Sequence, residues 1–375
     1  MAGLSLLDLS KRRSVPTAQA LGPAARGALR PLWTVRVMSN TSWFDGWRHG
    51  GTFVEASHVS GAGFFGTLRE SFATRDYDIA VLNCDLRRLL VFCLVRQLFP
   101  AARCRLVAVD PVLSHQSGLL GVAKARLLRR LLAVVDLFIF YHKDTTQLER
   151  VYGIGRERVE YVPFKINDYA NVLAATPTNE GFILSCGRSY RDYGTFCKAL
   201  QGLPYEARIL APAESARDHG TTFDFRSTPS NVTVITDDGS GRSWIDWIAR
   251  STFVVLPLFP NALTTAGISA CLVAMALGKC VIITESVATR GMLDHGETVV
   301  VPPSDPGALR AAMVKVSEDS GFRSKVAATG RAYALSLGDV HRLAADVRGV
   351  VQKRLLERTS LNPPAVEGHP LKSSP

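Results

Sequence analysis

The sequence lacks the features of a membrane-spanning, secreted or metal-binding chain. None of its apolar runs approaches the roughly 20 residues that a membrane-spanning helix needs, and the run at 131–141 is interrupted by Asp136. The basic residues at 11–13 are not followed by the apolar stretch and cleavage site of a secretory signal. The seven cysteines are odd in number and show no metal-ligand spacing. These absences predict a cytoplasmic protein with reduced cysteines and no metal site.

Acidic residues are also fewer than basic residues. The chain has 33 Asp and Glu against 44 Lys and Arg, which gives a formal net charge of +11. An excess of this size favours an anionic partner, and a nucleoside diphosphate, an anionic membrane surface and nucleic acid all qualify. We set nucleic acid aside because the sequence has no zinc-finger spacing, basic helix pair or RNA-recognition strand motif.

One helical segment bears on the membrane alternative. In residues 126–135, "RLLRRLLAVV", three arginines gather on one side of a helix and four leucines on the other. A stripe of this width is what a domain helix needs to face its core. The same pattern fits a peripheral position at the inner face of the cell membrane, so the sequence leaves both interpretations open.

Short apolar segments alternate with helical patterns along most of the chain, and 375 residues suffice for two domains. Strands separated by amphipathic helices predict parallel sheets covered by helices, that is, an α/β protein. We expect strands at 33–38, 52–59, 77–84, 104–110, 136–141 and 159–164, and then at 182–187, 206–212, 231–236, 252–258, 280–284 and 298–302.

The division between the two domains follows from the turn formers at "AATPTNEG". A last helix, which no strand follows, is expected to cross back to the first domain. The predicted parts are a flexible arm 1–30, a first Rossmann-like domain 31–173, a linker 174–181, a second Rossmann-like domain 182–338, a crossing helix 339–358 and a disordered tail 359–375.

Candidate ligand-binding residues lie in two loops of the second domain. Ligands of doubly wound sheets bind beyond the carboxyl ends of the strands. After the strand 182–187 come Gly187, Arg188 and Arg191, and a guanidinium can pair with a diphosphate through parallel hydrogen bonds. After the strand 252–258, small residues lead into a helix whose N-terminus favours an anion. These are Thr264, Thr265, Ala266 and Gly267.

The second half resembles the C-terminal domain of the family 4 (group 1) glycosyltransferases of the GT-B fold. The resemblance covers about 182–312 and includes "VAMALGKCVIIT" and "DHGETVVVPPSDPGALRAAM". It implies two Rossmann-like domains facing across a cleft, in which the Gly-Arg turn binds the diphosphate of a nucleotide-sugar. It also implies transfer with retention of configuration and no obligatory metal or other cofactor.

The sequence departs from that family at the residues that bind its donor. Alignment on "VAMALGK" sets Thr265 and Val273 at the positions of the two family glutamates, and Tyr193 at the position of its lysine. Arg191 is the proposed substitute for the lysine. Glu285, after the strand 280–284, is the candidate for the ribose hydroxyls. We expect Val273 to pack against the nucleoside without a polar contact.

The first domain supplies the candidates for catalysis. Asp110 and His115 follow the strand 104–110, where the resemblance implies a catalytic residue, and either one could orient the acceptor. The stretch "GAGFFG" at 61–66, with Asp85 beyond it, also matches a dinucleotide-binding pattern. However, it follows the second strand of its domain rather than the first.

The sequence therefore predicts a glycosyltransferase of polysaccharide biosynthesis. It would move a sugar from a nucleotide-sugar to a saccharide or lipid-linked acceptor. The alternative is a protein of the same fold that has lost turnover and acts as a binding or scaffold subunit.

Overall fold

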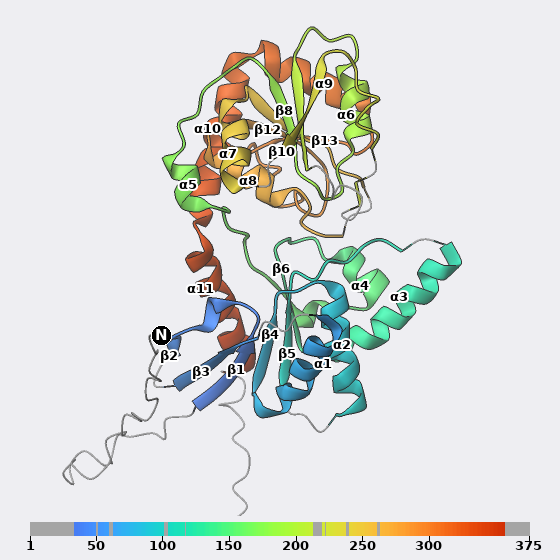
Figure 1. Ribbon diagram of the computed structural model, residues 1–375, viewed down its shortest axis with the longest axis vertical. Coiled ribbons are helices and arrows are strands. Elements are labelled where there is room, and N and C mark those ends of the chain that lie inside the picture. The colour runs from blue at the N-terminus through green and yellow to red at the C-terminus, as the bar shows by residue number, and fades with distance from the viewer. Residues whose placement is uncertain are drawn as a thin grey trace, which may run out of the picture.

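The computed structural model describes residues 34–49, 52–59, 63–100, 104–116, 118–212, 220–221, 223–237, 240–260 and 263–356. The predicted arm 1–30 and tail 359–375 lie outside these ranges. Figure 1 shows two domains along the long axis of the molecule, each built around a sheet with helices on its faces. The predicted α/β architecture of two Rossmann-like domains is confirmed.

The first sheet contains all six predicted strands. Its order is β2-β3-β1-β4-β5-β6-β7, and its strands run parallel except for β2, a short unpredicted strand that pairs antiparallel with β3. The strands are β1 (Thr34–Ser39), β2 (Arg48–His49), β3 (Thr52–His58), β4 (Ile79–Leu82), β5 (Arg105–Val109), β6 (Leu137–Phe140) and β7 (Val159–Tyr161).

Alternate residues of these strands face two different layers of helices. Met38 and Ala80 belong to a core shared with the helices that follow β4, β5 and β6. Their neighbours Val37 and Ile79 face the opposite layer, as the two-residue period of a strand requires. The first layer consists of α1 (Gly63–Ala73), α2 (Leu86–Leu98), α3 (Gly118–Leu132) and α4 (Thr146–Tyr152), with the short 3-10 turns η3 (Thr74–Asp76) and η4 (Arg156–Arg158) at its ends.

The second sheet has the strand order β10-β9-β8-β11-β12-β13 and is parallel throughout. Its strands are β8 (Ile183–Cys186), β9 (Ala207–Pro212), β10 (Val232–Asp237), β11 (Phe253–Leu256), β12 (Cys280–Thr284) and β13 (Val299–Val301). Its helices are α6 (Tyr193–Leu200), α7 (Gly241–Arg250), α8 (Ile268–Ala276), α9 (Pro306–Glu318) and α10 (Ser320–Leu337). In this order the connections reverse direction between β8 and β11, which is the position where doubly wound sheets bind ligands.

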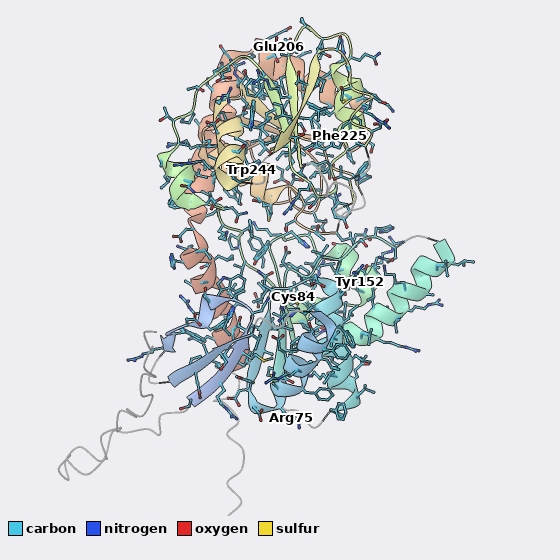
Figure 2. The ribbon with its side chains drawn as sticks, in the orientation of Figure 1. Arg75, Cys84, Tyr152, Glu206, Phe225 and Trp244 are labelled. Carbon is cyan, nitrogen blue, oxygen red and sulfur yellow. The ribbon has the colours of Figure 1, made fainter. Side chains whose placement is uncertain are left out.

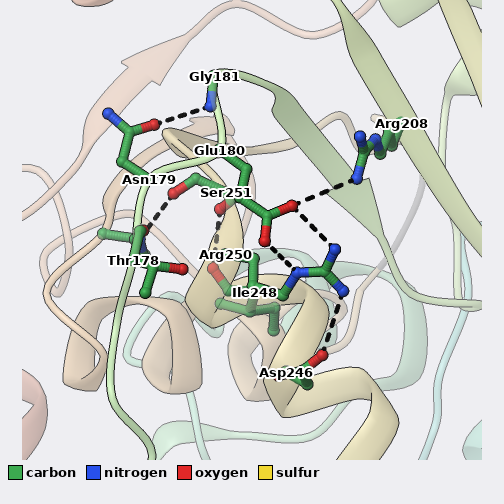
Figure 3. A network of polar contacts seen from close by, with 10 residues as sticks. Thr178, Asn179, Glu180, Gly181, Arg208, Asp246, Ile248, Arg250 and Ser251 are labelled. Carbon is green, nitrogen blue, oxygen red and sulfur yellow. Dashed lines mark hydrogen bonds and ion pairs between the residues drawn. The ribbon is translucent and has the colours of Figure 1, made fainter.

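The chain joins the second domain earlier than the linker expected at 174–181. Helix α5 (Tyr169–Ala174) precedes that segment, and its Val172 is buried in the second core together with Ile166. The segment itself is bonded to the second domain, as Figure 3 shows: Glu180 accepts hydrogen bonds from Arg250 and lies 3.9 Å from Arg208. The crossover between domains therefore lies between β7 and Ile166.

The last helix returns to the first domain (Figure 1). Helix α11 (Val340–Val351) begins after Asp339, whose carboxylate accepts from the N–H groups of His341 and Arg342. Its buried face packs on the first sheet beside the 3-10 turn η2 (Ser42–Phe44). A π-helical turn, η5 (Gln352–Leu356), continues it. The buried residues of α11 are Leu343, Ala344, Val347 and Val351.

Candidate functional site

A cavity of about 510 Å³ lies at the position where the second sheet reverses direction. Its walls come from the turn after β8, the N-termini of α7 and α8, and the segment that joins the domains. The first domain contributes Asp110, which follows β5. The lining residues are Asp110, Phe164, Asn167, Gly187, Arg188, Ser189, Arg191, Leu210, Ser240, Gly241, Trp244, Thr265, Ala266, Gly267, Ile268, Ser269 and Ala270.

The turn into α8 forms one wall of this cavity. Gly267 is the N-cap residue of the helix and has a left-handed φ of +86°. A Cβ there would approach the Leu258 side chain to 3.3 Å, so glycine suits the position in both conformation and space. The N–H groups of the first helical turn and the helix dipole make this end attractive to an anion.

The turn after β8 faces α8 across the cavity. Gly187 has a φ of +106°, and a Cβ there would lie 2.2 Å from Nη2 of Arg191. The hydroxyl of Tyr193 donates to the Gly187 carbonyl at 2.6 Å. The residue that aligns with the family lysine therefore supports the backbone of the turn.

The two candidate arginines of this turn differ in their surroundings. Arg188 is exposed at the cavity. Arg191 is 3% exposed, and its Nε and Nη1 donate to the carbonyls of Cys186 and Ser189, both at 2.7 Å. Arg191 thus holds the loop together, while Arg188 is exposed on the cavity lining.

Asp110 connects the first domain to the turn before α8. Its Oδ2 accepts a hydrogen bond from the Thr265 hydroxyl at 2.9 Å, and its own N–H donates to the Ile139 carbonyl at 2.7 Å. The residue has a left-handed φ of 44°, a conformation that aspartate tolerates better than most side chains. Burial raises the pKa of Asp110 to about 6, and the hydrogen bonds from Thr265 and from the N–H of Tyr141 oppose that shift.

Val273 does not line the cavity. Its side chain is fully buried in the core of the second domain, so the expectation that it packs against a nucleoside is wrong. The residue one turn earlier on the same side of α8 is Ser269, which does line the cavity. The valine is a packing residue.

A polar group that the sequence analysis missed lies beside Ser269. Nδ2 of Asn167 donates to the Ser269 hydroxyl at 2.5 Å, and the amide oxygen of Asn167 accepts from Lys165. Asn167 follows β7 within "KINDY", so a polar residue just beyond the carboxyl end of a strand was the available signal. Trp244 and the N-terminus of α7 complete this side of the cavity.

Three of the predicted site residues lie elsewhere. His115 is exposed and Thr264 is buried, and neither lines the cavity. Glu285 also lies outside the lining, and its carboxylate accepts from Arg290 at 2.9 Å. Arg290 in turn contacts Asp144 of the first domain at 2.7 Å. Glu285 therefore belongs to an ion-pair group between the domains.

The pattern "GAGFFG" does not lie at this cavity. Its first two residues are outside the described ranges, and the rest begin α1, which follows β3 near the edge of the first sheet. The sheet reverses direction between β1 and β4 instead. This position does not favour dinucleotide binding.

Comparison with known proteins identifies the domain at this cavity. Residues 231–319 match the family model of the glycosyl transferases group 1. No curated protein matches the sequence. The matched segment overlaps the predicted resemblance at 182–312 over residues 231–312, and the resemblance is thereby confirmed. The chain carries a glycosyltransferase domain.

Solved structures share the whole two-domain arrangement. HepE from Anabaena, in complex with UDP and glucose, is 16% identical over 80% of this chain and 86% of that chain, with a TM-score of 0.59. Sucrose-phosphate synthase from Thermosynechococcus elongatus is 16% identical over 89% and 91% of the two chains, with a TM-score of 0.58. The trehalose-phosphate synthase from Burkholderia vietnamiensis is 11% identical over 86% and 100%, with a TM-score of 0.55. At these identities the likeness supports the GT-B fold alone.

Proposed function

We propose that this protein, whose residues 231–319 match the group 1 glycosyltransferases, transfers a sugar from a nucleotide-sugar to a saccharide or lipid-linked acceptor. The observation that carries the proposal is the pairing of an anion-attracting helix end with an exposed arginine. Gly267 opens the N-terminus of α8 onto the cavity, and Arg188 lies on the cavity lining as well. A diphosphate fits between such groups because both favour negative charge.

The rest of the cavity suits a nucleoside. Ser269 and Asn167 offer a hydroxyl and an amide to the ribose, in place of Glu285, and Trp244 offers a ring on which a base can stack. HepE was crystallised with UDP-glucose, so a UDP-sugar is the first donor to test.

In the proposed reaction, the bond between the anomeric carbon and the phosphate oxygen breaks and a bond to the acceptor oxygen forms with retention. The proton of the acceptor hydroxyl passes to an oxygen of the departing nucleoside diphosphate. Arg188 and the amides of α8 stabilise the charge that develops on that group, so no obligatory metal is required. Asp110 faces the cavity from the first domain and accepts a hydrogen bond from the acceptor hydroxyl, which orients it for attack.

We further infer that the reaction takes place in the cytoplasm, peripherally at the inner membrane face. All seven cysteines are free, and six of them are buried. This is the state expected in a reducing compartment. No helix among the described residues is long and apolar enough to span a bilayer.

The test is a panel of UDP-, GDP- and ADP-sugars, each assayed for hydrolysis and for transfer to several acceptors. We expect turnover with one donor class and a product whose anomeric configuration, read by NMR, matches that of the donor. Asp110→Asn serves as the control for enzyme-dependent transfer. Binding of nucleotides without turnover across the panel would instead favour a binding or scaffold protein.

A further inference from the structure

The exposed apolar side chains of the molecule gather on one part of the first domain. Of the twelve large apolar residues that are exposed in the described ranges, ten lie between Phe64 and Leu127. The most exposed are Leu119 at 91%, Leu120 at 89% and Phe65 at 83%. Single exposed leucines are ordinary on protein surfaces, but adjacent large apolar residues that are each more than 80% exposed, as Leu119 and Leu120 are, suit contact with an apolar partner.

Four of these ten residues lie at the first turns of two helices. Phe64 and Phe65 begin α1, which follows β3, and Leu119 and Leu120 begin α3, which follows β5. Both helices therefore start at the carboxyl edge of the parallel strands. Asp110 follows β5 at the same edge, eight residues before α3 begins. We call Phe64, Phe65, Leu119 and Leu120 the apolar tips.

Helix α3 continues this surface away from the domain. Figure 1 shows it projecting beyond α2 and α4, with its first turn farthest from the body. Ala125, Leu128 and Leu132 are buried and attach it to the domain. Val122 and Leu127 are exposed, so the leucine stripe of the sequence faces the core only in part.

The positive charge of α3 favours an anionic partner for its exposed face. The helix contains Lys124, Arg126, Arg129 and Arg130 and no acidic residue. Two of the arginines share the exposed face of α3 with apolar residues, because their positions follow the helical period. The residues of this face are Leu119, Ala123, Arg126, Leu127 and Arg130. A helix that combines exposed leucines with arginines binds the interface of a bilayer, because the leucines enter the acyl boundary and the arginines meet lipid phosphates.

We propose that the apolar tips and the exposed face of α3 dock on an anionic lipid bilayer. Docking at this edge brings the loop of Asp110 close to the membrane surface. An acceptor anchored in the bilayer would then enter the cavity from the first domain. This last consequence rests on the proposed function, whereas the docking itself does not require a substrate.

The experiment is co-sedimentation of the full chain with large vesicles. One set contains phosphatidylcholine alone, and the other contains equal parts of phosphatidylcholine and phosphatidylglycerol. We expect binding only to the anionic set, weakened by added salt. Each cation at an anionic surface contributes roughly fivefold in affinity, so the double variant Arg126→Gln/Arg130→Gln should bind about 30-fold more weakly. Leu119→Ser/Leu120→Ser should lose roughly tenfold or more.

Control variants remove two positive charges, or one exposed leucine, from the second domain. Lys198→Gln/Lys325→Gln changes the net charge equally at two exposed positions, and Leu173→Ser removes an exposed leucine. All these variants should fold like the wild type because the replaced side chains are exposed. The proposal is overturned if the control variants lose as much binding as the α3 variants, or if the wild type ignores anionic vesicles. It is also overturned if the wild type is a dimer that Leu119→Ser/Leu120→Ser dissociates, because the surface would then join two copies.

The same preparations separate this inference from the proposed function. A chain that binds vesicles through α3 but transfers no sugar would overturn the function and leave the docking intact. The docking alone would be overturned by the opposite result. In that case the protein transfers sugar to a soluble acceptor with equal kcat/KM for the wild type and the α3 variants, but does not bind vesicles.

Discussion

The hydroxyl of Thr265 and the carboxylate of Asp110 form a 2.9 Å hydrogen bond between the two domains. In the alignment on "VAMALGK", Thr265 is the residue set against the first family glutamate. A glutamate there would bring a second carboxylate toward Asp110, whereas a threonine can donate to it. A threonine at position 265 is therefore compatible with a carboxylate at Asp110, whereas a glutamate would repel it.

This contact predicts the pH dependence of transfer. Burial raises the pKa of Asp110 to about 6, and the bond from Thr265 opposes the shift. If the ionised carboxylate orients the acceptor, kcat/KM should fall as the pH drops through about 6. Thr265→Val removes the bond, so the fall should begin at a higher pH. Thr264→Val, beside it but outside the cavity, should keep the wild-type profile, and His115→Ala should keep both the profile and the rate.

The same group predicts a pH dependence of stability. Its pKa in the folded chain lies above the ordinary value of 3.8, so the folded state binds the proton more tightly than the unfolded state. Relative to Asp110→Asn, the wild type should have its full extra stability below pH 3.8 and lose it as the pH rises through about 6. Urea unfolding of the two proteins at several pH values measures this difference. A constant difference would contradict the burial of the carboxylate.

The two arginines of the Gly187 turn should behave differently on removal. Arg188 is exposed at the cavity, and charged hydrogen bonds are worth about 1.5–3 kcal/mol. Arg188→Ala should therefore weaken nucleoside-diphosphate binding by roughly ten- to a hundredfold with no change in Tm. Arg191→Ala should lower the Tm as well, because its guanidinium binds two carbonyls of the loop. Calorimetry and thermal unfolding report the two effects.

A second exposed arginine, in the helix whose first residue lines the cavity, serves as the control for Arg188. Arg242 is exposed in the first turn of α7 but does not line the cavity. Arg242→Ala should bind nucleoside diphosphates like the wild type. If Arg188→Ala and Arg242→Ala lose equal affinity for nucleoside diphosphates, binding depends only on the overall positive charge of the region. A nucleoside without phosphates should bind the wild type and both variants equally.

Restoring the family carboxylate at Val273 should damage the fold. The side chain is fully buried among apolar neighbours, and an unpaired charge there has no compensating partner. Val273→Glu should lower the free energy of unfolding by more than about 4 kcal/mol, and Val273→Ala by less. Thermal unfolding checks this order. A stable Val273→Glu protein with tighter nucleotide binding would show that the residue reaches the site.

The ribose contact is tested through Asn167 and Ser269. Loss of one ordinary hydrogen bond costs about 1 kcal/mol, so Asn167→Ala and Ser269→Ala should each weaken nucleoside-diphosphate binding by roughly fivefold. The loss should disappear with a 2′,3′-dideoxyribose ligand, because that ligand lacks the hydroxyl groups in question. Thr329→Ala, at an exposed threonine of α10, is the neutral control. A loss that persists with the dideoxy ligand would assign these residues a structural role.

Much of the fold follows from local patterns in the chain. The twelve predicted strands are present because buried parallel strands need short apolar, β-branched segments, and such segments are visible in the sequence. Gly187 and Gly267 were identifiable because a turn before a helix often requires a positive φ. The ordered motifs from 182 to 312 also sufficed to recognise the glycosyltransferase domain.

Other features depended on which faces of the elements meet. The sequence could align Val273 with a glutamate, but only the packing of the second domain shows that Val273 is covered by the core. Ser269, one turn nearer the start of α8 on the same side, lies at the cavity. Likewise Glu285, Asn167 and Asp110 all follow strands. Glu285 belongs to an ion-pair group between the domains, whereas Asn167 and Asp110 line the cavity. The sequence by itself determined the elements and the kind of domain, because these depend on neighbours along the chain. The tertiary structure alone decided the membership of the site, because residues as far apart as Asp110 and Thr265 meet only when the two domains pack together.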